Sequence, residues 1–361
     1  MKKLENLVRI VADGRHNAFT SMERFNGALY LTYRTSGGHA MSDGAVSLKR
    51  SFDDGKSWED LASPFQSGRN FYEGFLVAFN GKLLMFAGGY EISNEVPVWF
   101  LHSREYVSES SDGVNWTPCK EIFPPFPIRF WHPAVLGDAL YAAAYRVIRT
   151  YFKANVWEVD LLRSKDGFTW EHVSDISRGS TANETALLFD EDRLFAFIRN
   201  EGGAGHLALR ETVKPFTEWS PEKDFGASLQ GPVAARINGR RFLFGRYRAA
   251  SPRLGTSLID RGGTELRCYV WEEKIGNWVE YLSFPSGGDC SYPAAVPLDE
   301  NRMLVSYYSQ HEYLDDPGFR DMEGPCDIFL ATVRTDGIPE WGRLTPGGRE
   351  YLKKFGLDRT S

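Results

Sequence analysis

The sequence predicts an all-β protein, a six-bladed β-propeller in which residues 1–361 form one domain. Three observations lead to this prediction. A short box that ends in tryptophan recurs along the chain, and a second set of turns, each followed by a strand-like run, alternates with it. The composition suits many short strands joined by tight turns, since the chain contains 10 Trp, 16 Tyr, 25 Phe and 35 Gly.

The boxes combine a serine, an aspartate-glycine turn and a tryptophan, and they occupy residues 51–58, 110–116 and 164–170. Weaker copies follow, and the complete set of box tryptophans is Trp58, Trp116, Trp170, Trp219, Trp278 and Trp341. We expect the aspartates of the three full boxes, Asp53, Asp112 and Asp166, to fold their own turns and not to contact a substrate. The tryptophan ladder therefore indicates six repeated units.

A second ladder of turn pairs lies between the boxes, and apolar runs such as 82–86 and 303–307 follow these pairs. The six pairs are Asn26-Gly27, Asn80-Gly81, Gly137-Asp138, Glu191-Asp192, Asn238-Gly239 and Glu300-Asn301. Another apolar run precedes each pair, for example 75–79 and 185–189. Each unit thus holds an inner hairpin and an outer hairpin closed by the box, and four strands repeated in this way are typical of a propeller.

Charge, targeting signals and cysteines narrow the function. The formal net charge of −6 argues against a nucleic-acid partner, and no apolar run approaches the roughly 20 residues of a membrane span. No signal peptide is evident, so a cytoplasmic protein is expected. The four cysteines lack metal-ligand spacing and are expected to be reduced thiols. No metal or organic cofactor is predicted, and the oligomeric state stays open.

The ends of the predicted inner strands should surround a central pocket. Before the turns stand Arg15-His16-Asn17, Tyr72-Glu73, Trp131-His132, Asn183-Glu184, Gln230 and Ser291-Tyr292. After them stand Arg34, Tyr90-Glu91, Arg146, Arg199, Arg246 and Gln310-His311. Several arginines near one axis repel each other unless carboxylates interleave or an anion binds there. The pattern therefore predicts either an anionic ligand or carboxylates placed between the arginines.

The boxes resemble the Asp-box (BNR) repeats of the sialidase (neuraminidase) superfamily, and the resemblance covers essentially the whole chain. It implies a six-bladed propeller and a glycoside hydrolase that cleaves a terminal sugar bearing a carboxylate. In that family three arginines bind the carboxylate, because a guanidinium matches it with two parallel hydrogen bonds. A tyrosine activated by a glutamate is the nucleophile, and an aspartate is the general acid and base.

Carried over residue by residue, the resemblance implies roles at named positions. Segment 183–187 leading to Arg199 is similar to the family's Glu-to-Arg strand pair, which implies that Glu184 activates the nucleophile and that Arg199 binds the carboxylate. Segment 291–305 is similar to the one that bears the nucleophile, which implies Tyr292. The other two carboxylate-binding positions fall on Arg15 and on either Arg246 or Arg261. Arg34 matches the arginine that ends the next strand, which implies a substrate-binding residue.

The position of the general acid stays open between two residues. The family's aspartate should follow Arg34 within the loop 35–43, where residue type selects Asp43 and counting forward selects His39. His132, in a Trp-His-Pro segment, is a candidate pocket residue, and Asp289 is interpreted as a turn residue.

The predicted function is a sialidase-like glycoside hydrolase whose partner is a small acidic sugar or oligosaccharide. Sialic acid is the family's typical substrate, and related 2-keto sugar acids or uronates stay open. One alternative is a non-catalytic carbohydrate-binding propeller that keeps the arginines. Another is an atypical glycosidase or polysaccharide lyase that acts on acidic glycans through His39 or His132.

Overall fold

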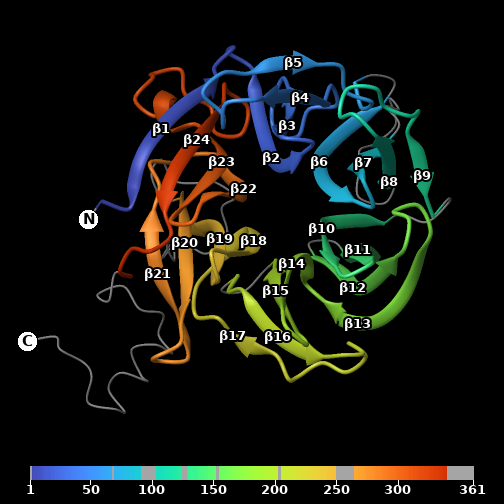
Figure 1. Ribbon diagram of the computed structural model, residues 1–361. Helices are drawn as coiled ribbons and strands as arrows, with labels where there is room; N and C mark the ends of the chain where they lie inside the picture. Colours follow the sequence, from blue (N-terminus) through green and yellow to red (C-terminus); the bar gives the residue numbers. More distant parts are fainter. Residues whose placement is uncertain are drawn as a thin grey trace, which may run out of the picture.

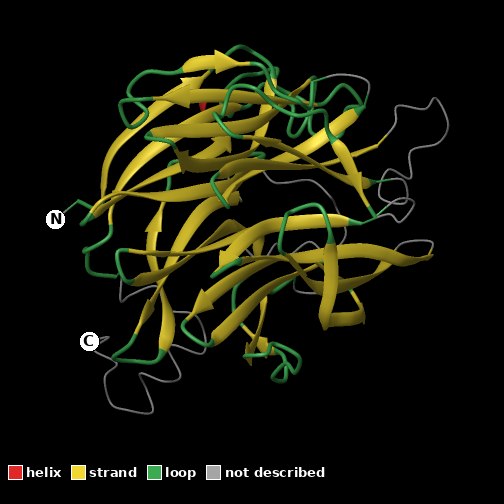
Figure 2. Ribbon diagram, turned by 45° about the vertical axis from the view of Figure 1, so that its right-hand side comes forward, coloured by secondary structure: helices red, strands yellow, loops and turns green. Residues whose placement is uncertain are grey.

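The computed structural model describes residues 2–66, 69–90, 103–123, 128–151, 154–201, 205–248 and 264–339. These residues form six four-stranded antiparallel sheets arranged as blades around a central axis, which confirms the predicted six-bladed β-propeller (Figure 1). Strands and loops account for nearly all of the described chain (Figure 2), and its one helical element is the short η1 (His311–Tyr313). No described helix is long and apolar enough to cross a membrane.

Each blade has its first strand next to the axis and its last strand at the periphery (Figure 1). The first blade contains β2 (His16–Phe25), β3 (Ala28–Ser36), β4 (Ala45–Ser51) and β5 (Glu59–Leu61). The second contains β6 (Asn70–Phe79), β7 (Lys82–Tyr90), β8 (Arg104–Ser110) and β9 (Lys120–Ile122). The third contains β10 (Arg129–Leu136), β11 (Ala139–Tyr151), β12 (Ala154–Ser164) and β13 (Trp170–Ser180). The fourth contains β14 (Ala182–Asp190), β15 (Arg193–Asn200), β16 (Ala208–Val213) and β17 (Lys223–Asp224).

The last two blades complete the ring. The fifth contains β18 (Leu229–Ile237), β19 (Arg240–Arg248), β20 (Thr264–Glu272) and β21 (Asn277–Ser283). The sixth combines β22 (Cys290–Asp299), β23 (Arg302–Ser309) and β24 (Asp327–Arg334) with β1 (Leu4–Val11). In Figure 1 the blue strand β1 lies beside the red strand β24, with Leu7 opposite Ala331. The ring is therefore closed by hydrogen bonds between strands from the two ends of the described chain.

All six predicted turn pairs join the first and second strands of a blade, as expected for inner hairpins. In three of them, Asn26-Gly27, Asn80-Gly81 and Asn238-Gly239, both residues have positive φ. This conformation matches the twist of the flanking strands, and Asn-Gly adopts it readily. The second ladder is thus confirmed as the set of inner turns.

The three full boxes join the third and fourth strands of the first three blades. Asp112 Oδ1 accepts hydrogen bonds from Ser110 Oγ at 3.0 Å and from the Asn115 N–H at 2.7 Å, and these bonds hold the pKa of Asp112 below its ordinary value. A Cβ atom on Gly113 would lie 2.1 Å from the Tyr30 hydroxyl of the preceding blade. The box aspartates therefore fold their own turns, as predicted, and each glycine permits close packing between blades. Trp341 lies outside the described residues.

Candidate active site

An irregularity that repeats in every blade brings side chains to the axis. In each first strand the pairing with the second strand shifts, so that two residues stand opposite one. The first residues of these six bulges are Phe19, Tyr72, His132, Asn183, Gly231 and Tyr292. Bulges twist a strand and redirect its side chains. The shared fold of the blades thus supplies equivalent positions around one centre.

A cavity of about 350 Å³ lies at four of these bulges, those of Phe19, Tyr72, Asn183 and Tyr292. Its charged lining comprises four arginines and three glutamates, namely Arg129, Arg199, Arg246, Arg248, Glu73, Glu184 and Glu201. Aromatic walls come from Phe19, Tyr72, Tyr145, Trp157 and Tyr292. A polar pocket with aromatic walls and an excess of arginine suits an anionic, hydroxyl-rich ligand.

Tyr292 and Glu184 form the central pair of this cavity. The Tyr292 hydroxyl donates to Glu184 Oε1 at 2.8 Å, and Arg199 Nη1 lies 2.8 Å from the same oxygen. The backbone N–H of Gly231 donates to Glu184 Oε2 at 3.2 Å. Burial, followed by the charge of Glu184, raises the pKa of Tyr292 well above its ordinary value. Tyr292 is therefore a neutral phenol whose proton is directed at a carboxylate.

The Tyr292 ring is fixed from several sides. Its centroid lies 4.9 Å from that of Phe19 and 5.4 Å from that of Trp131, both with edge-to-face geometry. Trp131 is in turn fixed by a 2.7 Å hydrogen bond from its Nε1 to the Pro232 carbonyl. Gly231 supports the remaining face, because a Cβ atom there would lie 2.8 Å from the ring. This packing leaves the tyrosine little freedom to turn away from Glu184.

Arg246 and Arg248 supply positive charge on one wall. Arg246 is 5% exposed, and its Nη1 donates to Asp289 Oδ1 at 2.8 Å while Nη2 donates to Gln230 Oε1 at 2.9 Å. Arg248 has no hydrogen bond or ion pair from its guanidinium to another described residue. Burial, together with the charges of Arg246 and Arg199, lowers the pKa of Arg248. A bound anion would relieve this repulsion.

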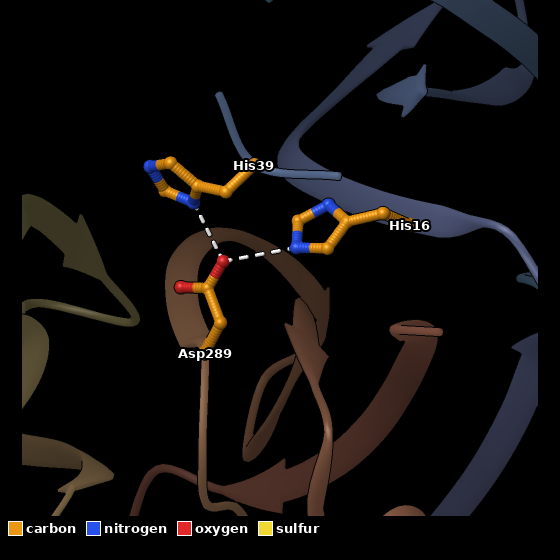
Figure 3. A group of neighbouring side chains, drawn as sticks. All are labelled: His16, His39 and Asp289. Carbon is orange, nitrogen blue, oxygen red and sulfur yellow. Dashed lines mark hydrogen bonds and ion pairs between the residues drawn. The ribbon is translucent and has the colours of Figure 1, made fainter. Parts of the chain in front are cut away.

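A buried carboxylate, Asp289, adjoins the cavity and contacts two histidines. Its Oδ2 lies 2.6 Å from His39 Nδ1 and 3.0 Å from His16 Nε2 (Figure 3). The side chains of these three residues are close enough to hold a metal ion, with ligand atoms within 4.8 Å of one another. The facing atoms already bond to each other, however, and Asp289 also binds Arg246, so both carboxylate oxygens of Asp289 have partners without a metal.

The structure brings together only part of the predicted site. Tyr292, Glu184, Arg199, Arg246 and His39 all line the cavity. Arg261 lies outside the described residues. The other four predicted residues, Arg15, Arg34, Asp43 and His132, are not among the described residues that line it.

Arg15 and Asp43 pair with each other at the surface. Their side chains are 50% and 54% exposed, with Arg15 Nη2 3.2 Å from Asp43 Oδ2. Both carboxylate oxygens of Asp43 also accept from the Gly37 N–H at 3.0 Å. Asp43 therefore closes a loop turn, and this geometry does not fit the general-acid role predicted for it.

Arg34 is buried and His132 is half-buried, and both contact other protein groups. Arg34 is fully buried and donates to the backbone carbonyls of Phe71, His39 and Met41, at 3.0, 3.1 and 2.7 Å. It holds the loop that carries His39 and so does not bind a ligand carboxylate in this arrangement. The centroid of the His132 ring lies 4.3 Å from that of the Phe75 ring, and burial lowers the pKa of His132 to about 3. His132 is thus a neutral, half-buried residue that packs on Phe75.

Sequence reasoning missed Asp289, Arg129 and Arg248. The repeat does contain a signal for Asp289 and Arg129, namely their spacing from the bulge residue. Asp289 stands three residues before the bulge at Tyr292, just as His16 precedes Phe19 and Arg129 precedes His132. Arg129 forms an ion pair with Glu73 at the cavity wall. Aligning the six units on their bulges would therefore have marked this position as one that reaches the axis.

Comparisons with known proteins agree with the fold. The sequence matches no protein-family model and no curated protein. A protein of unknown function from Dyadobacter fermentans superposes with a TM-score of 0.72 at 21% identity, covering 92% of this chain and 98% of that one. The Trypanosoma rangeli sialidase superposes with a TM-score of 0.64 at 13% identity, covering 98% of this chain and 60% of the sialidase. The phage phi92 endosialidase superposes with a TM-score of 0.63 at 11% identity, covering 93% of this chain and 70% of the endosialidase.

This chain therefore spans about three fifths of the length of the trypanosomal sialidase. Identities of this size establish a shared architecture and leave activity to be argued from the site. The protein has the six-bladed β-propeller fold that sialidases and an endosialidase also have.

Proposed function

We propose that this protein is a glycoside hydrolase that cleaves a terminal carboxylate-bearing sugar, sialic acid or a related acidic sugar, from a glycoside. The observation that carries the proposal is the 2.8 Å hydrogen bond from the Tyr292 hydroxyl to Glu184, inside a cavity with more arginines than carboxylates. A sialidase of the same fold has been solved in complex with sialic acid. The excess of arginine in this cavity suits the carboxylate of such a ligand.

The proposed reaction proceeds in two steps. In the first, Tyr292 Oη attacks the anomeric carbon, its proton passes to Glu184, and the glycosidic C–O bond breaks with protonation of the leaving oxygen. In the second, water attacks the same carbon and gives a proton to the group that protonated the leaving oxygen, the bond to Tyr292 breaks, and Glu184 returns its proton to the phenol. A neutral phenol approaches a carbon that bears a carboxylate more readily than an anionic nucleophile would.

The exposed position of Asp43 favours one other candidate, a non-catalytic sugar-binding propeller. Fluorogenic α-glycosides of sialic acid, its deaminated analogue and a uronic acid separate the two. We expect fluorophore release from a sialic-acid-type glycoside, with loss of release in Glu184→Gln. Glu211→Gln is the matched control, because Glu211 pairs with Lys223 on the outer part of the same blade. Binding of the free sugar acid without release from any glycoside would instead establish the binding propeller.

Gly231→Ala is expected to lower both the rate of cleavage and stability. The new Cβ would lie 2.8 Å from the Tyr292 ring, and Gly231 has a φ of +57°. We expect about 1–3 kcal/mol of destabilisation from strain in denaturant unfolding, and a fall in kcat because the phenol leaves Glu184. Gly239→Ala is the control, since Gly239 also has positive φ but nothing lies within 4 Å of its Cβ position. Equal kcat in the two variants would contradict the role given to this contact.

A further inference from the structure

The carboxylate of Asp289 is fully buried and receives four side-chain hydrogen bonds. Its Oδ2 faces His39 Nδ1 at 2.6 Å and His16 Nε2 at 3.0 Å, while Oδ1 accepts from Arg246 Nη1 at 2.8 Å and from the Tyr308 hydroxyl at 3.0 Å. Burial alone would raise the pKa of Asp289, but His39, His16 and Arg246 hold it well below the ordinary value. Asp289 is therefore an ionised acceptor.

An ionised carboxylate fixes the tautomers of the two imidazoles. It only accepts hydrogen bonds, so His39 carries its proton on Nδ1 and His16 carries its proton on Nε2. The second nitrogen of His39 points away from Asp289 (Figure 3), and His39 lines the cavity with its side chain 21% exposed. The His16 side chain is fully buried, and its Nδ1 has no hydrogen-bond partner among the described residues. Only His39 of this pair therefore presents a nitrogen to a ligand.

The backbone around His39 is fixed by buried polar groups. The His39 N–H donates to the Met322 carbonyl at 2.7 Å. Gln310 Oε1 accepts from the N–H groups of both Met322 and Asp289, at 3.3 and 2.9 Å. Arg34 Nη1 donates to the His39 carbonyl at 3.1 Å from the other side. One glutamine thus links the backbone that carries the carboxylate to the backbone that orients the histidine.

We propose that His39 is the general acid and base of this cavity and that Asp289 is its positioning residue, in the place of the aspartate expected at Asp43. The inference rests on the proposed function and names the group that protonates the leaving oxygen. His39 and Tyr292 pack against the same Phe19 ring, with ring centroids 5.2 and 4.9 Å away, and both line the cavity. The ionisable groups around His39 include Asp289, His16 and Arg34, together with Asp321 from the loop that bears Met322.

In this role the imidazolium form of His39 gives its Nε2 proton to the leaving oxygen as the glycosidic bond breaks. Neutral His39 then takes a proton from water as the water oxygen bonds to the anomeric carbon and the bond to Tyr292 breaks. The histidine ends in its starting form, and the net reaction is hydrolysis. The hydrogen bond between His39 Nδ1 and Asp289 Oδ2 holds the imidazole ring in place through the cycle.

Glycosides with different leaving groups test this proposal. An aryl glycoside with an acidic phenol needs little protonation as it departs, whereas an alkyl glycoside depends on it. In His39→Gln we expect kcat/KM for the alkyl glycoside to fall by about 10²–10⁴, and kcat/KM for the aryl glycoside to fall less than tenfold. His172→Gln is the matched control, since His172 also pairs with an aspartate, Asp175 at 2.8 Å, but lies 50% exposed on the third blade.

Asp289→Asn tests the positioning role with the same two substrates. An amide no longer attracts the Nδ1 proton as a carboxylate does, so we expect the same selective loss on the alkyl glycoside. Because both residues act through one nitrogen, the double variant with His39→Gln should be little worse than His39→Gln alone. A loss that multiplies in the double variant would show that Asp289 does not act through His39.

The outcomes separate this inference from the proposed function. If the wild type cleaves neither glycoside, the proposed function fails. If the wild type cleaves both glycosides and His39→Gln lowers kcat/KM equally for the two, the proposed hydrolase function is supported and His39 is not the general acid. If Asp43→Asn lowers kcat/KM for the alkyl glycoside much more than for the aryl glycoside, Asp43 is the general acid. Loss of wild-type activity in EDTA, restored by Zn²⁺, would replace the dyad with a metal site at His16, His39 and Asp289.

Discussion

Tyr292→Phe is expected to lower kcat by about 10³-fold or more while the free sugar acid still binds. The variant removes the attacking oxygen and its 2.8 Å hydrogen bond to Glu184, but it keeps the ring that packs against Phe19 and Trp131. Turnover is measured with the fluorogenic glycoside that the wild type cleaves, and binding by isothermal titration calorimetry. The separation of rate from binding distinguishes a nucleophile from a residue that only shapes the pocket.

Tyr307→Phe is the control for this prediction. Tyr307 is fully buried like Tyr292, but its hydroxyl donates to the Pro285 carbonyl at 2.8 Å. We expect a small loss of stability and an unchanged kcat. Mass spectrometry gives a second readout, because a slow fluorinated substrate should leave a covalent adduct on Tyr292 of the wild type. A rate in Tyr292→Phe equal to that of the wild type would remove the phenol from the mechanism.

Arg246→Met is expected to cost about 3–5 kcal/mol of unfolding free energy and to weaken binding of the sugar acid strongly. The variant leaves the fully buried Asp289 carboxylate and the Gln230 amide oxygen without their guanidinium partner. Urea unfolding measures the stability, and calorimetry measures the binding. Arg163→Met is the control, since Arg163 pairs with Glu171 at the exposed edge of a blade, where an ion pair contributes at most about 1 kcal/mol.

The stability difference between Arg246→Met and the wild type should depend on pH. Since the pKa of Asp289 is held low in the native state, this stabilisation is present above the pKa of an unfolded carboxyl, about 3.9, and is lost as the pH falls through the native value. The deficit of the variant should therefore be full at pH 7 and shrink in acid. A deficit that stays constant as the pH falls from 7 through the native pKa of Asp289 would mean that Arg246 acts through packing alone.

Much of the fold was predictable because its signals are local and repeated. The Asn26-Gly27, Asn80-Gly81 and Asn238-Gly239 turns adopt the backbone conformation that this residue pair favours. The box aspartates bond to their own loops and need no distant partner. The roles of Tyr292 and Glu184 were implied by the resemblance to the sialidase superfamily, and in the structure both residues stand at bulges beside the axis and share a hydrogen bond.

The histidine-aspartate pair was not predictable, since it depends on how a loop crosses between blades. Asp43 and His39 share one short loop, and which of them turns inward is decided by carbonyls that bind Arg34 and by the Met322 carbonyl. Asp289, in a Gly-Gly-Asp stretch, has the local signature of a turn. Its role appears only when His39 and Arg246, from two other blades, converge on it.

The closure of the ring by β1 and β24 has a consequence for when this site can exist during biosynthesis. His39 belongs to the first blade and Asp289, 250 positions later, to the sixth, and the two meet only across the seam where these blades touch. A nascent chain on the ribosome can fold its early blades as they emerge, yet it has no assembled dyad until the last blade docks. The proposed activity is thereby withheld from partly made chains.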